Sequence, residues 1–245
     1  MPHQPSNISE ALTQAISQLE PIFDAPRLTA WCQAFACFLS GEDATEKLGA
    51  LLENEQAPYP ELIQFTLARA FLQQGHAERA LPLLNELLQQ RPQQLTIHLE
   101  YGLGLIFCER FEEAAEHLEA SIQRFALLPE RALLIADLCT VYHRLGEWEK
   151  GEACCTPTAD SSPQARCSLL SNRAAFRIAL GRHDEAEADL REALSSAPEH
   201  AAAWANLAYL RQSQGRWAEA QAALQHEPSQ LELLLGSVPM RERAR

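Results

Sequence analysis

The segment "GRHDEAEADLREALSSAPEHAAAWANLAYLRQSQGRWAEAQAAL" (Gly181–Leu224) contains two matching phrases, GRHDEA from Gly181 and GRWAEA from Gly215. They begin 215 − 181 = 34 residues apart. Stepping back through the chain from Gly181 reaches comparable places, which we call the turn positions: Gly41, Gly75, Glu109, Gly146, Gly181 and Gly215, with spacings of 34, 34, 37, 35 and 34 residues. A period of this length indicates an array of structural repeats.

Other residue types keep the same period. Proline stands 17 residues after four of the turn positions. A small residue stands seven residues before each turn position and, in most repeats, another stands five residues after it. The prolines are Pro58, Pro92, Pro163 and Pro198; the small residues before are Ala34, Ala68, Gly102, Cys139, Ala174 and Ala208. Those after are Ala80, Ala114, Gly151, Ala186 and Ala220, with Glu46 as the exception. Between these positions the apolar residues follow helical spacing, so each repeat is predicted to be a helix, a tight turn and a second helix.

The last repeat shows a family pattern most clearly, through Trp204, Leu207, Ala208, Gly215, Ala220 and Leu224. With the 34-residue period, these residues resemble the tetratricopeptide repeat (TPR), and residues 61–94, 95–128 and 167–200 resemble it less completely. The resemblance implies an all-α, right-handed superhelical solenoid of antiparallel helix pairs with about five to six repeats. Such a stack presents an extended concave surface.

The period divides the chain into a solenoid over 27–228 with caps at both ends. We expect a degenerate first repeat at 27–60 and further repeats at 61–94, 95–128, 132–163, 167–200 and 201–228. Residues 1–26 are predicted to form a capping helix and arm, and 229–245 a closing helix and basic tail. Three departures stand out: Gly151 replaces alanine, the stretch "CCTPTADSSPQ" ends a second helix early, and Arg177 and Arg211 replace the aromatic of the pattern.

Composition excludes several classes of function. A formal charge of −13 over 245 residues repels nucleic-acid phosphates, and no run is long and apolar enough to insert into a membrane. The first twenty residues lack the pattern of a secretory signal, so we expect a cytoplasmic protein. Seven cysteines without C-x-x-C spacing are expected to be reduced and mostly buried.

No local motif of an enzyme is present: the sequence lacks H-E-x-x-H, the phosphate-binding P-loop and G-x-S-x-G. The triplet "HDE" from His183 is better explained as the polar first turn of a helix than as a metal site. We therefore expect no catalytic residues, metal or cofactor. An enzyme or redox protein that uses Cys154 and Cys155 remains a third alternative.

In the proteins that this chain resembles, the first helix of each repeat lines the concave groove. The predicted groove residues are Leu62, Phe65, Arg69, Leu99, Glu100, Leu103, Phe107, Asp137, Asn172, Arg173, Asn206 and Tyr209. Asn172 and Asn206 are interpreted as an amide ladder for a peptide backbone, and Glu100 and Asp137 as favouring a basic partner. Arg173 offers a single cationic contact. The apolar members are explained equally well as groove or as core, because both faces follow the same period.

These observations predict a non-enzymatic adaptor or assembly chaperone that binds another protein or a peptide in its groove. The alternative is an oligomeric structural scaffold for an enzyme or secretion complex, with a homodimer formed through an apolar surface.

Overall fold

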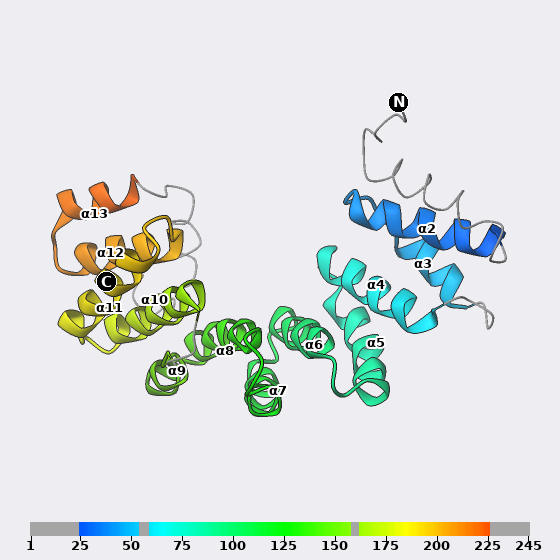
Figure 1. The fold of residues 1–245 in the computed structure, drawn as a ribbon, viewed down its shortest axis with the longest axis horizontal. Coiled ribbons are helices and arrows are strands. Elements are labelled where there is room, and N and C mark those ends of the chain that lie inside the picture. Colours follow the sequence, from blue (N-terminus) through cyan, green and yellow to red (C-terminus); the bar gives the residue numbers. More distant parts are fainter. Residues whose placement is uncertain (1–24, 54–58, 158–161, 226–245) are drawn as a thin grey trace. The chain divides into compact units, whose positions relative to one another are not determined.

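The computed structural model describes residues 25–53, 59–157 and 162–225. Within these ranges the chain forms helices joined by turns and contains no strand (Figure 1). The helices are α2 (Ala25–Leu39), α3 (Thr45–Leu52), α4 (Pro60–Gln73), α5 (Ala77–Gln90), α6 (Leu95–Phe107), α7 (Phe111–Arg124), α8 (Arg131–Leu145), α9 (Trp148–Cys154), α10 (Pro163–Ala179), α11 (His183–Ser196), α12 (Ala201–Ser213) and α13 (Trp217–Leu224). The expected caps before residue 25 and after residue 228 lie outside the described residues.

The helices belong to two compact units. Unit 1 (Met1–Arg110) holds α2 to α6, and unit 2 (Phe111–Arg245) holds α7 to α13. In unit 1, each helix packs on the next, and the first helices α2, α4 and α6 also contact one another in turn. In unit 2, the first helices α8, α10 and α12 make the same succession. This arrangement confirms the predicted all-α solenoid of helix pairs.

Each hairpin reverses through one residue in the left-handed backbone region. At five turn positions that residue is glycine, with φ between 73° and 78°. Glu109 occupies the remaining turn position and adopts the same backbone region, with φ of 56°. A side chain costs roughly 1–2 kcal/mol in this conformation, whereas glycine adopts it freely. The geometry of the turn is therefore kept even where the sequence does not supply the favoured residue.

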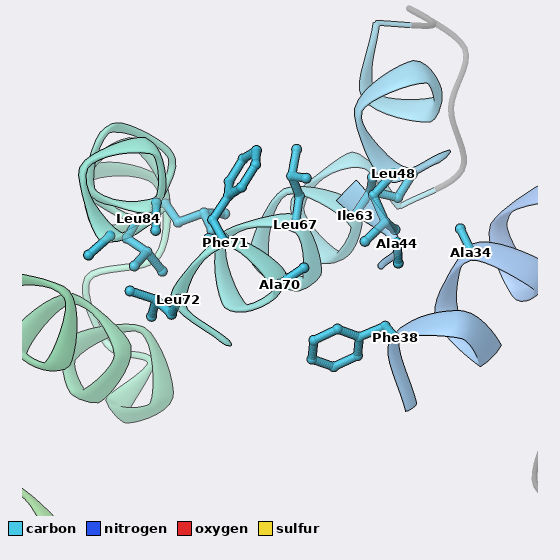
Figure 2. Close-up of a cluster of buried hydrophobic side chains, with 14 of the residues drawn as sticks. Ala34, Phe38, Ala44, Leu48, Ile63, Leu67, Ala70, Phe71, Leu72 and Leu84 are labelled. Atoms are coloured by element: carbon cyan, nitrogen blue, oxygen red, sulfur yellow. The ribbon is translucent and has the colours of Figure 1, made fainter. Parts of the chain in front are cut away.

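The core of unit 1 is apolar and is built around the small residues of the period. Ala34, Ala68 and Ala80 are fully buried, which lets neighbouring helices approach closely. Figure 2 shows the cluster they belong to, with side chains such as Leu48, from α3, and Ile63, from α4, alongside those of α2 and α5. Burial of these side chains supplies the main stabilisation of the stack.

The core of unit 2 contains charged side chains as well as apolar ones. Arg177 Nε lies 2.9 Å from Glu152 Oε1, and Arg211 Nη1 lies 2.6 Å from Glu187 Oε2. Each arginine lies four residues before a turn position, and each glutamate lies six after the preceding one. The two arginines that replace the aromatic of the family pattern thus form the same ion pair with the preceding repeat. Both pairs are mostly buried, with only 8% of the Arg211 side chain exposed.

Two further departures also have a structural reason in unit 2. A Cβ atom added to Gly151 would lie 2.2 Å from a ring carbon of Phe176, so alanine does not fit there. The helix α9 ends at Cys154, early in the stretch expected to break it. The next helix starts at Pro163, and the Ser162 hydroxyl caps it by accepting a hydrogen bond from the Ala165 amide at 3.2 Å.

Candidate functional site

Seven of the twelve predicted groove residues fall on two neighbouring helices of unit 1. Leu62, Phe65 and Arg69 follow one another at three- and four-residue steps along α4, so they share one face of that helix. Leu99, Glu100, Leu103 and Phe107 form a stripe of the same kind along α6. Because α4 and α6 contact each other, the structure brings these two stripes into one surface, which we call the α4–α6 surface.

An ion pair joins the two stripes. Arg69 Nε lies 2.9 Å from Glu100 Oε1, so the guanidinium of α4 donates to the carboxylate of α6. Burial raises the pKa of Glu100 above its ordinary value, and the charge of Arg69 opposes that rise. The acidic side chain predicted to attract a basic partner therefore already has a cationic neighbour. Of the two, the Arg69 side chain is the more exposed.

Two aromatic rings lie beside the same guanidinium. The Arg69 Cζ atom is 5.5 Å from the ring centroid of Phe38 and 6.0 Å from that of Phe65. These distances are within the range of cation–π attraction. Both rings and the Glu100 carboxylate thus attract the same guanidinium. These contacts favour one position of the cationic centre.

Apolar side chains flank this centre and remain partly exposed. Leu62 is 41% exposed and Phe107 is 53% exposed, while Phe65, Leu99 and Leu103 are half-buried. Thr66, four residues after Leu62 on α4, is buried and donates its hydroxyl to the Leu62 carbonyl at 2.7 Å. Core and surface positions, which the period alone did not separate, are therefore distinguished by the structure.

The five predicted groove residues of unit 2 are more closely involved in internal contacts. Asn206 is buried, and its Nδ2 donates to Ser171 O at 3.0 Å and to Ser171 Oγ at 3.1 Å. Arg173 donates through two nitrogens to the buried Asp189, at 2.9 and 2.7 Å. These contacts hold α12 on α10 and α10 on α11. The other three residues are half-buried: Asp137, Asn172 and Tyr209.

Two aromatic residues of α2 adjoin the α4–α6 surface but were not among the predicted residues: Phe38, which is buried, and Phe35, which is half-buried. Phe38 contacts Arg69 as described, and its ring lies 6.2 Å from that of Phe35, centroid to centroid. The period contains the signal that identifies Phe35, because Phe35 and Arg69 both lie six residues before a turn position. The weak first repeat concealed that equivalence.

An open hollow of about 690 Å³ lies between α5 and α6. Its wall is formed by Glu78, Leu81, Pro82, Asn85, Tyr101, Cys108 and Arg110. Burial, assisted by Glu78, raises the pKa of the Cys108 thiol, which therefore stays protonated at neutral pH. A protonated thiol is a weak nucleophile. The hollow has both polar and apolar walls, and its thiol is not activated.

Comparison with known proteins agrees with this architecture. Residues 65–124 and 177–231 match family models described as tetratricopeptide repeat. These two stretches of the chain are therefore tetratricopeptide repeats. The sequence matches no curated protein. None of the TPR helices that the structure describes combines the length and apolar character needed to cross a membrane.

Solved TPR structures share the fold at low identity. A TPR protein of Parabacteroides merdae is 17% identical, with a TM-score of 0.64, over 86% of this chain and 78% of that one. A thermophilic TPR protein of Thermus thermophilus is 22% identical, with a TM-score of 0.56, over 72% of this chain and 96% of that one. MamA of Desulfovibrio magneticus is 11% identical, with a TM-score of 0.54, over 71% of this chain and 96% of that one. At such identities the likeness establishes the TPR fold alone.

Proposed function

We propose that this TPR protein is an adaptor or assembly chaperone that binds a partner protein on the α4–α6 surface of unit 1. The observation that carries the proposal is the Arg69–Glu100 pair, which has two aromatic rings near its guanidinium and exposed Leu62 and Phe107 on the same two helices. Interfaces commonly combine a fixed arginine and aromatic rings at the centre with apolar contacts around them.

The same surface defines the kind of segment that fits it. Leu62 and Phe107 offer apolar contacts, and half-buried Phe65 and Leu103 extend them along two helices. A helix or extended segment with several apolar side chains would cover this area. The more exposed Arg69 favours a hydrogen-bond acceptor on the partner, such as a carbonyl or a carboxylate. The α4–α6 surface thus favours a partner with a hydrogen-bond acceptor, whereas Glu100 alone led us to expect a basic partner.

The test compares capture by the full chain with capture by a surface variant, Leu62→Glu combined with Phe107→Glu. Both side chains are exposed, so the folded state tolerates the changes. The control is Leu127→Glu in unit 2, where the native leucine is 97% exposed. We expect a captured protein to bind the surface variant at least about tenfold more weakly, because each lost apolar contact in an interface is worth roughly 1 kcal/mol or more.

Equal binding to wild type, variant and control would refute the proposal that the partner binds the α4–α6 surface. Asn206→Ala is unsuitable as a probe, because the Asn206 amide is buried and holds α12 on α10 through Ser171. Loss of binding in that variant would report damage to the fold.

An oligomeric scaffold is the second candidate, and one observation favours it. The loop between α7 and α8 carries adjacent leucines, Leu127 and Leu128, that are 97% and 42% exposed. Exposed apolar pairs of this kind can be buried between copies of a chain. Mass measured over a range of protein concentrations tests this candidate: a dimer that Leu127→Glu dissociates supports it, and a monomer at all concentrations contradicts it.

A further inference from the structure

Three cysteine side chains converge in unit 2, where α9 folds back on α8. The Sγ atom of Cys139, on α8, lies 2.9 Å from that of Cys155 and 3.9 Å from that of Cys154. The Cys154 and Cys155 sulfurs are 3.8 Å apart. All three thiols are free, and the three sulfur atoms lie within 4.8 Å of one another.

The hairpin itself explains the convergence. Cys139 lies seven residues before Gly146, and Cys154 and Cys155 lie eight and nine residues after it. Gly146 adopts φ of 74° and reverses the chain, so residues at equal distances on either side come to lie opposite each other. Cys154 is the last residue of α9, and Cys155 is its C-cap. The three thiols therefore occupy the open end of the α8–α9 helix pair.

The sulfur separations suit a metal ion. Thiolates bound to Zn²⁺ lie about 2.3 Å from the metal, which in tetrahedral geometry places two sulfurs about 2 × 2.3 × 0.82 ≈ 3.8 Å apart. Two of the three observed separations have this value. The third, between Cys139 and Cys155, would have to widen by about 0.9 Å. Cys155 is the C-cap residue of α9, so this movement involves the helix end rather than a packed interior turn.

The surroundings also favour bound metal. Cys139 and Cys155 are buried, which excludes water from two of the donors, whereas Cys154 is half-buried and leaves one side open to solvent. A bound metal ion displaces the thiol proton of each cysteine that it contacts. The thiolate is the form of cysteine that binds metal.

We propose that Cys139, Cys154 and Cys155 bind one thiophilic d¹⁰ metal ion, Zn²⁺ or Cu⁺, which fixes the end of α9 to α8. Soft thiolate donors select these ions over Mg²⁺ or Ca²⁺. Three thiolates satisfy trigonal Cu⁺, and Zn²⁺ takes a water as fourth ligand through the open side of Cys154. Three metal–sulfur bonds form, the protons of the bound thiols pass to the buffer, and nothing is oxidised.

The test titrates the full chain, reduced, metal-free and under anaerobic conditions, with each ion against a chromophoric chelator. Separate titrations with Zn²⁺ and Cu⁺ identify which ion binds more tightly. We expect one ion per chain for the preferred metal. Cys139→Ala, Cys154→Ala and Cys155→Ala should each lower the affinity about 100-fold or more, because each removes one donor. The matched control is Cys167→Ala, which changes a fully buried cysteine outside the cluster and should leave the affinity within about threefold.

A second measurement uses wild-type protein alone and so does not depend on the folding of the variants. Amide hydrogen exchange across residues 148–155 should slow by at least about tenfold when the ion is added, because the clamped helix end no longer frays. Exchange that stays unchanged would overturn the proposed clamp. Binding that is weak, or equally strong in the three variants and the control, would overturn the metal site. The metal site would also be overturned if the reduced protein binds neither ion and instead forms a Cys139–Cys155 disulfide in air.

Discussion

Replacing Gly151 by alanine should destabilise unit 2, although the same change usually stabilises a helix. An added Cβ would lie 2.2–2.6 Å from three ring atoms of Phe176, whereas ordinary contacts are 3.4 Å or more. The ring, which is only 2% exposed, must therefore move by at least 3.4 − 2.2 = 1.2 Å. Overpacking on this scale costs about 3 kcal/mol, and the helix propensity of alanine returns about 1 kcal/mol. The free energy of unfolding should fall by about 2 kcal/mol.

Urea denaturation followed by tryptophan fluorescence and circular dichroism measures this change. Three of the four tryptophans lie in unit 2, so fluorescence mainly reports the affected half. The control is Gly49→Ala on α3, where an added Cβ meets nothing within 4 Å and should stabilise unit 1 by up to about 1 kcal/mol. Combining Gly151→Ala with Phe176→Leu should cost at least about 1 kcal/mol less than the sum of the single changes. A stabilising Gly151→Ala, or no coupling with residue 176, would refute the reasoning.

Three further expectations concern the turns and the charged core. Glu109→Gly should be more stable than Glu109→Ala by about 1 kcal/mol in chemical denaturation, because only the alanine variant keeps a Cβ at φ of 56°; equal stabilities would show that the turn is unstrained. Glu187→Gln should lower the free energy of unfolding by about 2 kcal/mol, since it removes the nearer carboxylate from the buried Arg211 and leaves it the more distant Glu219, at 3.4 Å and 52% exposed; a change below about 0.5 kcal/mol would contradict this. The hydrogen bonds from Arg211, together with its charge, lower the pKa of Glu187 from 4.5 to about 2, so its contribution is complete above pH 4.5 and is lost as the pH falls through 2. The stability difference between wild type and Glu187→Gln should therefore narrow over that range, and a constant difference would contradict the assignment.

The fold was predictable because its determinants are local and repeated. A small residue stands seven positions before every turn position, and a glycine that permits positive φ and a proline after the second helix recur in most periods. Glu109 shows why the period identifies more turns than residue type alone. At that position the flanking helices impose the left-handed conformation on glutamate, and only the spacing reveals it.

The roles of single side chains were less predictable, because they depend on contacts between repeats. Asn206 has the period of a groove residue, yet its amide is turned to Ser171 on the neighbouring first helix. Gly151 looked like a weak match to the family, but the residue that requires it, Phe176, lies 25 positions later. The cysteine cluster was not predictable for the same reason. Cys154 and Cys155 are adjacent in the sequence, whereas their structural neighbour, Cys139, is on the other side of the turn.

The ion pairs Arg177–Glu152 and Arg211–Glu187 restrict how repeats can be rearranged. In unit 1 the places equivalent to the two arginines hold Cys37, which is half-buried, and Phe71 and Leu105, which are buried and apolar. A repeat moved from unit 2 into unit 1 would leave its arginine in the core without a glutamate, at a cost of several kcal/mol. Whole-repeat deletion and shuffling are usually tolerated by solenoids because every junction is alike. In this chain the junctions differ in chemistry, so the order of the repeats is itself encoded in the core.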